Sequence, residues 1–529
     1  MQNKIYAAVK DALASLGAGE ASFVVERPRD MSHGDYATNA ALVAKVDAQA
    51  LADKLIIEGV EKVEVVGKFI NFFLSRQALV PKPQEIPQIY AGKKVMVEYT
   101  DPNPFKEFHI GHLMSNTIGE SIARLFEVSG AVATRANYEG DVGLHVAKAL
   151  WGKQRKPEAS WGEAYVYGSD SYEAHREEID ALNKIIYEKS DASVNALYDE
   201  GRAASLAHFE EIYKKLGTKF EHYFFESQTW AVGLDLVRKN TGAVFKESEG
   251  AVIYPGEQDG LHTRVFINKA GLPTYEAKDL GLLDLKAKAG DFDTSITVTA
   301  TEQKEYFRVV LAAAKHIAEI KGIADKTAHV THGMMRFAEG KMSSRKGNVI
   351  TGESLIEDLT AVAKEKMQGR ELKDADKTAE QIAVGAIKYA VLKQGSGRDI
   401  IFDPEKSLSL EGDSGPYLQY ARVRALSLVA AAKEAGISPS LDDMPEHASA
   451  LERILIHYPA VIARAAKEME PHYVTTYLTE VAAAFNSWYA ANKVIGGQNP
   501  HFGVWLAYAA IKTLTEGLQV LGIPAPEEM

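Results

Sequence analysis

The segment VMVEYTDPNPFKEFHIGH, residues 95–112, decides the fold of the central part of the chain. Its first six residues are mostly apolar and predict a buried strand. An apolar pattern of helical spacing over 109–130 predicts a helix, and Gly130 stands where helices commonly end. Residues 131–138 predict a second strand. Strand, helix and strand in this order form a β-α-β unit, and such units build parallel sheets.

A second unit of the same kind follows later in the chain. Residues 295–300 and 328–333 predict two further strands with an amphipathic helix between them. The stretch from about 150 to 265 is rich in charge and predicts a mostly helical insertion. A hairpin-like pattern over 252–254 and 264–267 ends it. We therefore expect an α/β multidomain protein whose Rossmann-like parallel-sheet core is split by an insertion.

Composition shifts mark the boundaries of that core. Residues 80–94 contain three prolines within seven positions, which helices and central strands both disfavour. They predict a linker over 79–94 that follows a small α+β domain at 1–78. Strand patterns disappear beyond 376, so the core is expected at 95–375 and an all-α domain at 376–529. The segments that predict helices there are 377–394, 415–435, 448–469, 473–492 and 502–521.

Composition also excludes several classes of protein. The chain has 529 residues and no cysteine, so it has neither disulfides nor thiolate metal sites. No apolar stretch is long enough for a membrane span, and the N-terminus does not resemble a signal peptide, so we expect a cytoplasmic protein without a membrane partner. With 60 Lys and Arg against 72 Asp and Glu, the net charge is −12. That acidity argues mildly against a nucleic-acid partner, because phosphate binding requires positive charge.

The start of the helix at 109–130 has the chemistry of a phosphate site. A helix N-terminus offers free N–H groups and partial positive charge, and His109, His112 and Lys106 surround it. Gly111 allows a ligand to approach the backbone closely. A capped helix with a structural histidine pair, or a histidine metal site, are the alternatives. Without cysteine or a suitably spaced acidic ligand, we predict no metal site.

A second basic segment, GKMSSRKGNVIT at 340–351, follows the strand at 328–333. Lys341 and Arg345 lie in a stretch bounded by glycines, and such a cationic loop can close on the charge of a transferring phosphate. By itself the segment would be read as a solvated basic turn.

Together, these two segments resemble the two signature motifs of the class I aminoacyl-tRNA synthetases. HIGH stands unaltered at 109–112, and KMSSR at 341–345 differs from the KMSKS motif at Ser344. Further stretches are similar to the arginine-specific members of that family, from one end of the chain to the other. They are HGDYATNAA, GLPTYEAKD, SGPYLQYARVR and the closing LGIPAPEEM.

The resemblance implies an arginine–tRNA ligase that takes part in translation. Such an enzyme activates L-arginine with ATP, with Mg²⁺ bound to the nucleotide, and forms arginyl-adenylate. It then transfers the arginyl group to the 3′-terminal adenosine of tRNA(Arg). We expect a monomer whose partners are tRNA(Arg), L-arginine and ATP.

The resemblance also implies roles for individual residues. The catalytic set would be His109, His112, Lys106 and Lys341. The ATP-binding set would be His109, Gly111, His112, Met342, Ser343, Ser344 and Arg345. Lys106 is expected to compensate for the missing second lysine at Ser344. Asp101, where the family more often has serine, adds a negative charge whose direction the sequence leaves open.

An arginine substrate agrees with the chemistry of the matching positions. A guanidinium is a planar cation that prefers carboxylates and flat polar or aromatic surfaces. Glu98 ends a strand, and Tyr275 and Asp279 are four residues apart, so on a helix they share a face. A surface helix pair is the alternative. The full arginine-binding set would be Glu98, Asn103, Tyr275, Asp279 and Gln303, with Asn103 and Gln303 holding the amino and carboxylate ends.

The two ends of the chain resemble RNA-binding domains. The N-terminal domain is similar to the domain that contacts the D-loop at the tRNA elbow, where Phe69 would stack on a base and Asn71 would hydrogen-bond to it. Val66 replaces an expected polar residue there. The C-terminal helices resemble an anticodon-binding domain, although their aromatic residues also suit a core. The tRNA-binding set would be Phe69, Asn71, Tyr417, Tyr420, Arg424 and Trp488.

Three other functions agree less well with the sequence. Nucleotidylyltransferases that share the HxGH pattern are typically far smaller. A cysteine-specific synthetase usually needs a zinc ion bound by cysteine, which this chain lacks. An RNA-binding relative without catalysis would be expected to lose the histidine or lysine motif, and both are present.

Overall fold

The computed structural model describes residues 1–81, 85–338 and 350–529. Two compact units emerge from its contacts. The terminal unit comprises Met1–Pro87, Tyr420–Arg464 and Thr476–Glu516, and the sheet unit comprises Gln88–Gln419, Ala465–Thr475 and Gly517–Met529. Lys341, Met342, Ser343, Ser344 and Arg345 lie outside the described residues.

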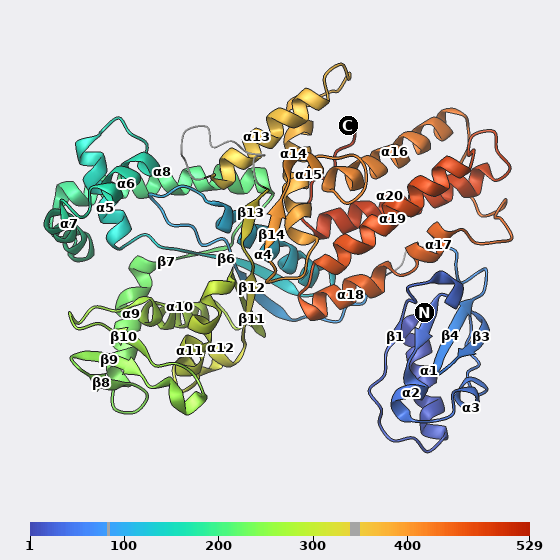
Figure 1. The fold of residues 1–529 in the computed structure, drawn as a ribbon, viewed down its shortest axis with the longest axis horizontal. Helices are drawn as coiled ribbons and strands as arrows, with labels where there is room; N and C mark the ends of the chain where they lie inside the picture. The colour runs from blue at the N-terminus through green and yellow to red at the C-terminus, as the bar shows by residue number, and fades with distance from the viewer. Residues whose placement is uncertain (82–84, 339–349) are drawn as a thin grey trace. The chain divides into compact units, whose positions relative to one another are not determined.

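A five-stranded parallel sheet forms the centre of the sheet unit (Figure 1). Every neighbouring pair is parallel, in the order β12-β11-β5-β6-β7. The parallel sheet predicted from the two β-α-β patterns is confirmed. From β5 the chain first adds β6 on one side of the sheet and later adds β11 on the other side. Ligands of open α/β sheets bind where the direction of strand addition reverses in this way. The strands are β5 (Lys94–Glu98), β6 (Val132–Glu139), β7 (His222–Phe225), β11 (Thr294–Ala300) and β12 (Thr327–His332).

Helix α4 (Ile110–Val128) connects β5 to β6 and is buried along most of its length. Gly119 lies against the Tyr99 ring so closely that an added Cβ would collide with it. This contact holds the helix on the sheet and thereby fixes the place of its N-terminus.

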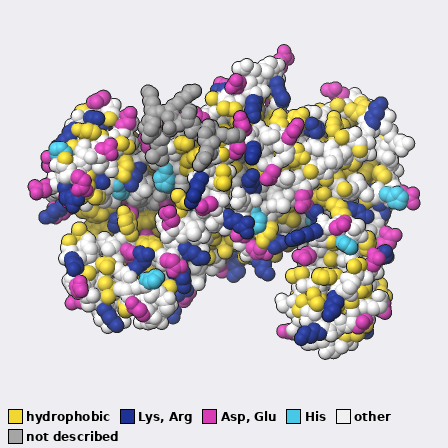
Figure 2. Space-filling model, in the orientation of Figure 1, with side chains coloured by type: hydrophobic (Ala, Val, Ile, Leu, Met, Phe, Trp, Pro, Cys, Tyr) yellow, Lys and Arg dark blue, Asp and Glu magenta, His cyan; other side chains and the backbone are white. Residues whose placement is uncertain are grey.

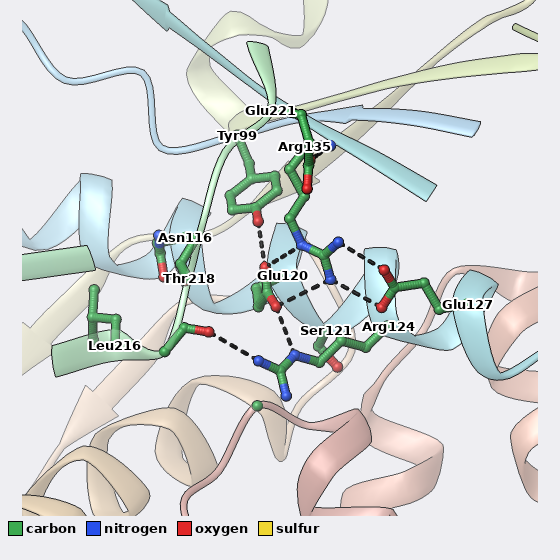
Figure 3. Close-up of polar contacts among 12 residues, drawn as sticks. Tyr99, Asn116, Glu120, Ser121, Arg124, Glu127, Arg135, Leu216, Thr218 and Glu221 are labelled. Carbon is green, nitrogen blue, oxygen red and sulfur yellow. Dashed lines mark hydrogen bonds and ion pairs between the residues drawn. The ribbon is translucent and has the colours of Figure 1, made fainter. Parts of the chain in front are cut away.

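A buried polar network fastens α4 to the rest of the sheet unit (Figure 3). Glu120 of α4 accepts hydrogen bonds from the Tyr99 hydroxyl, from Arg124 Nε at 2.6 Å and from Arg135 Nε at 2.8 Å. Arg124 also donates to the Gln519 carbonyl oxygen at 2.8 Å. Because the Glu120 side chain is only 2% exposed, this carboxylate depends on its partners for stabilisation.

Replacing Glu120 by glutamine is expected to destabilise the sheet unit by about 3–5 kcal/mol, because Arg135 would keep its charge without its buried partner. Thermal unfolding followed by circular dichroism would measure the effect. Glu127→Gln is the matched control, since Glu127 binds the same arginine from a side chain that is 40% exposed. Equal stability of the two variants would show that burial of Glu120 contributes nothing.

The insertion has two parts, which Figure 1 shows as separate groups. Four helices pack around a core that contains Val146, Leu150 and Ile179. After them the chain returns to the central sheet as β7, a strand that the sequence did not predict. A second group follows, in which β9 and β10 form the expected antiparallel hairpin. The elements are α5 (Leu144–Arg155), α6 (Trp161–Asp170), α7 (Arg176–Glu188), α8 (Ala192–Leu216), α9 (Glu226–Lys239), β8 (Lys246–Ser248), β9 (Ala251–Tyr254) and β10 (Arg264–Ile267).

Four further helices belong to the sheet unit. Helix α10 follows the hairpin, α11 follows β11, and α13 begins just after the undescribed residues 339–349. The long helix α14 agrees with the segment predicted at 377–394. Their bounds are α10 (Tyr275–Ala289), α11 (Lys304–Lys315), α13 (Gly352–Lys366) and α14 (Ala375–Leu392).

The terminal unit combines an antiparallel sheet with helices. Its four strands have the order β1-β2-β4-β3, and the apolar run at 69–74 forms β4. The segment predicted as one helix at 448–469 is broken in two, because Pro459 has no N–H to continue the first helix. The strands are β1 (Val25–Glu26), β2 (Tyr36–Thr38), β3 (Val60–Val66) and β4 (Phe69–Leu74). The C-terminal helices of the chain are α16 (Gly415–Glu434), α17 (Ala450–Leu455), α18 (Tyr458–Glu468), α19 (His472–Ala491) and α20 (Pro500–Val520).

Charge is mixed over the face drawn in Figure 2, where basic and acidic side chains alternate. The net charge of −12 is therefore an average over both signs. No helix in the described ranges is both long and apolar enough to cross a membrane.

Candidate functional site

A cavity of about 590 Å³ opens at the carboxyl ends of β5 and β11. It lies where the strand order reverses, as expected for a ligand site in an open α/β sheet. The structure brings nine of the predicted residues together in its walls. They are Glu98, Asn103, Lys106, His109, Gly111, His112, Tyr275, Asp279 and Gln303.

The two histidines cap the N-terminus of α4. The His112 N–H faces His109 Nδ1 at 3.4 Å, and the His109 N–H donates to His112 Nδ1 at 3.2 Å. Because each Nδ1 accepts, Nε2 carries the proton in both rings. Burial, together with Lys106, lowers the pKa of His109 to about 4, and burial holds the pKa of His112 well below its usual value. Both rings are therefore neutral hydrogen-bond donors at pH 7, and they add no charge to the phosphate site.

Lys106 supplies the positive charge beside these histidines. Its ammonium lies 4.9 Å from the centre of the Tyr165 ring, which α6 of the insertion contributes. No ion pair of Lys106 occurs within the described ranges. The loop that carries it is unusual, since Thr100, Asp101 and Phe105 all have left-handed backbones. Such strain persists only where the surroundings hold it, and it is common at functional sites.

The opposite wall of the cavity is acidic. Asp279 stands on α10, one turn after Tyr275, as the spacing predicted, and accepts a hydrogen bond from the Tyr306 hydroxyl at 2.6 Å. Desolvation raises the pKa of Asp279 to about 7, with Glu98 adding to the effect. Glu98 is 2% exposed and lies 2.6 Å from Lys286 Nζ. Tyr275, which is 64% exposed, stands at the edge of the cavity.

Sequence reasoning missed two residues of this wall, Tyr306 and Glu226, and the buried Lys286 that pairs with Glu98. Lys286 lies seven positions after Asp279, so helical spacing alone could have placed it on the same face. No spacing in the sequence links Tyr306 or Glu226 to Asp279, because they lie on other elements, which fold against α10 from elsewhere in the chain. Glu226 pairs with Lys278 at 2.7 Å.

The segment that follows the predicted basic loop is attached to the histidine motif. Thr351 pairs with His109 as an isolated β-bridge, and the Gly352 N–H donates to the Phe108 carbonyl oxygen at 2.7 Å. Thr351 also caps α13 through Ser354. The point at which residues 339–349 rejoin the described chain is therefore next to His109.

The predicted tRNA-binding residues lie outside this cavity. Phe69 is 48% exposed, whereas Asn71 is only 3% exposed in the middle of β4. The Arg424 guanidinium lies 4.7 Å from the Tyr420 ring centre. Trp488 lines a second cavity of about 530 Å³, which belongs to the terminal unit. Tyr417 lies in the first turn of α16 and is partly buried in the sheet unit.

Three families of known domains match successive parts of the chain. The description "Arginyl tRNA synthetase N terminal domain" applies to residues 3–74. "tRNA synthetases class I (R), catalytic domain" matches 75–404, and "DALR anticodon binding domain" matches 418–529.

Whole proteins give the same result. The chain is 30% identical to an arginine–tRNA ligase of Limosilactobacillus reuteri, with 100% of both chains covered. An arginine–tRNA ligase of Treponema denticola is 29% identical and covers 92% of this chain and 90% of its own length. The solved structure of Thermus thermophilus arginyl-tRNA synthetase superposes with a TM-score of 0.84 at 25% identity, over 100% of both chains. The chain therefore belongs to the arginine–tRNA ligases, the arginine-specific family of class I aminoacyl-tRNA synthetases.

Proposed function

We propose that this chain activates L-arginine with ATP and transfers the arginyl group to the 3′-terminal adenosine of tRNA(Arg). One observation carries the proposal: the N-terminus of α4, which can bind phosphate, and the acidic and aromatic wall formed by Asp279 and Tyr275 line the same cavity. The first feature suits ATP and the second suits a guanidinium. Family membership supplies the reaction that would connect them.

In the first step, the substrate carboxylate attacks the α-phosphorus of ATP, and pyrophosphate leaves. Asp279 and Glu98 would hold the guanidinium with Tyr275 against it, while Asn103 and Gln303 would orient the reacting end. His109 and His112 would donate Nε2–H to phosphate oxygens, and Lys106 would stabilise the developing negative charge. Positioning and charge stabilisation account for most of the rate in such a step.

The remaining charge stabilisation would come from outside the described residues. We expect Lys341 and its loop to approach the phosphates from the side opposite the histidines. Mg²⁺ would enter bound to the ATP phosphate oxygens and neutralise charge as pyrophosphate leaves. Within the described ranges, no three His, Asp or Glu side chains are grouped to hold a metal ion.

In the second step, the 2′-hydroxyl of the terminal adenosine attacks the arginyl carbonyl carbon and AMP leaves. We propose that Phe69 stacks on a base at the tRNA elbow and that Tyr420, Arg424 and Trp488 contact the anticodon arm. Asn71 is too buried for direct contact with a base in this conformation, so we base the elbow contact on Phe69. We also propose that the chain acts as a monomer in the cytoplasm.

Pyrophosphate exchange into ATP tests the proposal. Each of the twenty amino acids is assayed with and without tRNA, because the family usually needs tRNA for activation. We expect exchange with arginine when tRNA is present. Exchange with lysine instead, or no exchange with any amino acid in the presence of tRNA, would refute the arginine assignment.

A further inference from the structure

Asp101 lines the cavity and is only partly exposed. Its Oδ1 accepts a hydrogen bond from the Tyr138 N–H at 2.8 Å, and its own N–H donates to Asn137 Oδ1 at 3.1 Å. Asp101 has a left-handed φ of 50°. Because a backbone of this kind is costly for a residue other than glycine, the surroundings must hold it in place.

The cavity contains more carboxylates than cationic partners. Glu98 is paired with Lys286 and Glu226 with Lys278. In the part of the chain that the structure describes, neither Asp101 nor Asp279 has an ion-pair partner, although both line the cavity. Glu302 also lines the cavity without an ion pair in the described ranges, but it is exposed. Asp101 and Asp279 are thus the two shielded carboxylates that have no cation of their own, beside the already paired Glu98. Arginine carries two cationic groups, its guanidinium and its α-ammonium.

We propose that Asp101 binds the α-ammonium group of the arginine substrate, while Asp279 receives the guanidinium. This inference rests on the function proposed above and adds a specificity-determining residue to it. The opposite orientation, with the guanidinium at Asp101 and the ammonium at Asp279, fits less well. Asp101 belongs to the loop that leads through Lys106 to His109, where the phosphates would bind. The α-ammonium is attached next to the carboxylate that reacts with those phosphates, so it should lie at this end of the cavity. Asp279 lies among the tyrosine rings of α10 and α11, which suit a guanidinium.

The electrostatic surroundings of Asp101 favour a cationic ligand. Burial raises the pKa of this carboxyl group well above its usual value, and Glu98 on β5 and Glu139 on β6 act in the same direction. The Tyr138 N–H and Lys286 on α10 oppose them. An ionised Asp101 is therefore poorly compensated in the empty cavity, and a bound ammonium group would supply the missing charge.

Arginine analogues that lack one group test the proposal in tRNA-dependent aminoacylation. Agmatine keeps the amine and lacks the carboxylate, whereas 5-guanidinopentanoate lacks the amine. In Asp101→Asn, which keeps an acceptor for Tyr138, we expect the KM for arginine and the Ki for agmatine to rise about tenfold to a hundredfold. The Ki for 5-guanidinopentanoate should stay within twofold. Asp279→Asn is the matched variant and should weaken both analogues, since both contain the guanidinium.

Equal weakening of 5-guanidinopentanoate and arginine in Asp101→Asn would overturn the proposal, because Asp101 would then serve the guanidinium or the shape of the cavity. Unchanged binding of all three compounds would overturn it as well. Asp101→Ser, checked by its unfolding temperature, replaces the asparagine variant if that variant does not fold.

The wild type gives a test without any variant. Agmatine should bind at least tenfold more tightly than butylguanidine, from which it differs by the amine alone, and equal affinities would contradict the proposal. Failure of the wild type to charge tRNA with arginine would refute the proposed function itself, which is a different outcome from any of these.

Discussion

Asparagine in place of Asp279 is expected to lower kcat/KM for arginine by about two to three orders of magnitude, while KM for ATP changes less than threefold. The substitution keeps the size of the side chain and its contact with the Tyr306 hydroxyl, and removes only the charge. Loss of one partner from a buried, hydrogen-bonded charge pair costs about 3–4 kcal/mol, which corresponds to that factor. ATP is expected to be little affected because its phosphates would bind at the N-terminus of α4.

Steady-state aminoacylation with arginine and ATP varied in turn would measure the effect. Asp284→Asn is a matched control on the same helix, since Asp284 pairs with Lys288 and does not line the cavity. The control should behave like the wild type. Similar increases of KM for arginine and ATP in Asp279→Asn would instead indicate that Asp279 supports the structure of the cavity.

The same carboxylate predicts a pH dependence of arginine binding. The pKa of Asp279 is raised to about 7, so below pH 7 the empty site is mostly protonated and cannot pair with a guanidinium. As the pH falls from 7 to 6, KM for arginine should rise up to tenfold, and above pH 8 this contribution should be constant. In Asp279→Asn, KM for arginine should lose the part of its pH dependence that comes from titration of the Asp279 carboxyl group. An identical pH profile in wild type and variant would contradict the assignment.

The sequence predicted what depends on local pattern. The β-α-β unit that begins at residue 95, the place where α4 starts and the shared face of Tyr275 and Asp279 all follow from spacing within one or two elements. The fifth strand was missed because the four residues of β7 are too few to stand out in a charge-rich insertion. The break at Pro459 was missed because the apolar pattern continues through it.

The partners of the site residues could not be predicted in the same way. Tyr306 of α11 bonds to Asp279 and Tyr165 of α6 lies beside Lys106, so only tertiary packing reveals these two contacts. Helical spacing places Lys286 on the face of Asp279, but its pairing with Glu98 of β5 also depends on the fold. The protonation of the histidines also depends on burial. Two histidines beside a phosphate site would suggest positive charge from the sequence alone. In the fold, burial keeps His109 and His112 neutral, so Lys106 provides the positive charge beside them.

Methionine in place of Lys106 is therefore expected to reduce kcat for aminoacylation by about two to three orders of magnitude, with KM for arginine changed less than threefold. Loss of one preorganised group that stabilises transition-state charge typically costs about 2.7–4 kcal/mol. Lys106 is well placed for this role, because it lines the cavity beside His109 and its ammonium lies over a ring, with no carboxylate paired to it among the residues that the structure describes. We expect this dependence on Lys106 to be stronger because Ser344 stands where the KMSKS motif has a lysine.

Single-turnover formation of arginyl-adenylate in the presence of tRNA would measure the chemical step directly. Lys148→Met is the matched control: Lys148 lies 4.4 Å from the centre of the Tyr172 ring, but it does not line the cavity. Tyr165→Phe, which keeps a ring under the Lys106 ammonium, should retain activity, whereas Tyr165→Leu should lose part of it. A Lys106→Met enzyme as active as the Lys148→Met control would mean that the loop containing Lys341 stabilises the transition state without help from the histidine side. A rise in KM for ATP at unchanged kcat would mean that Lys106 binds ATP equally in the ground and transition states.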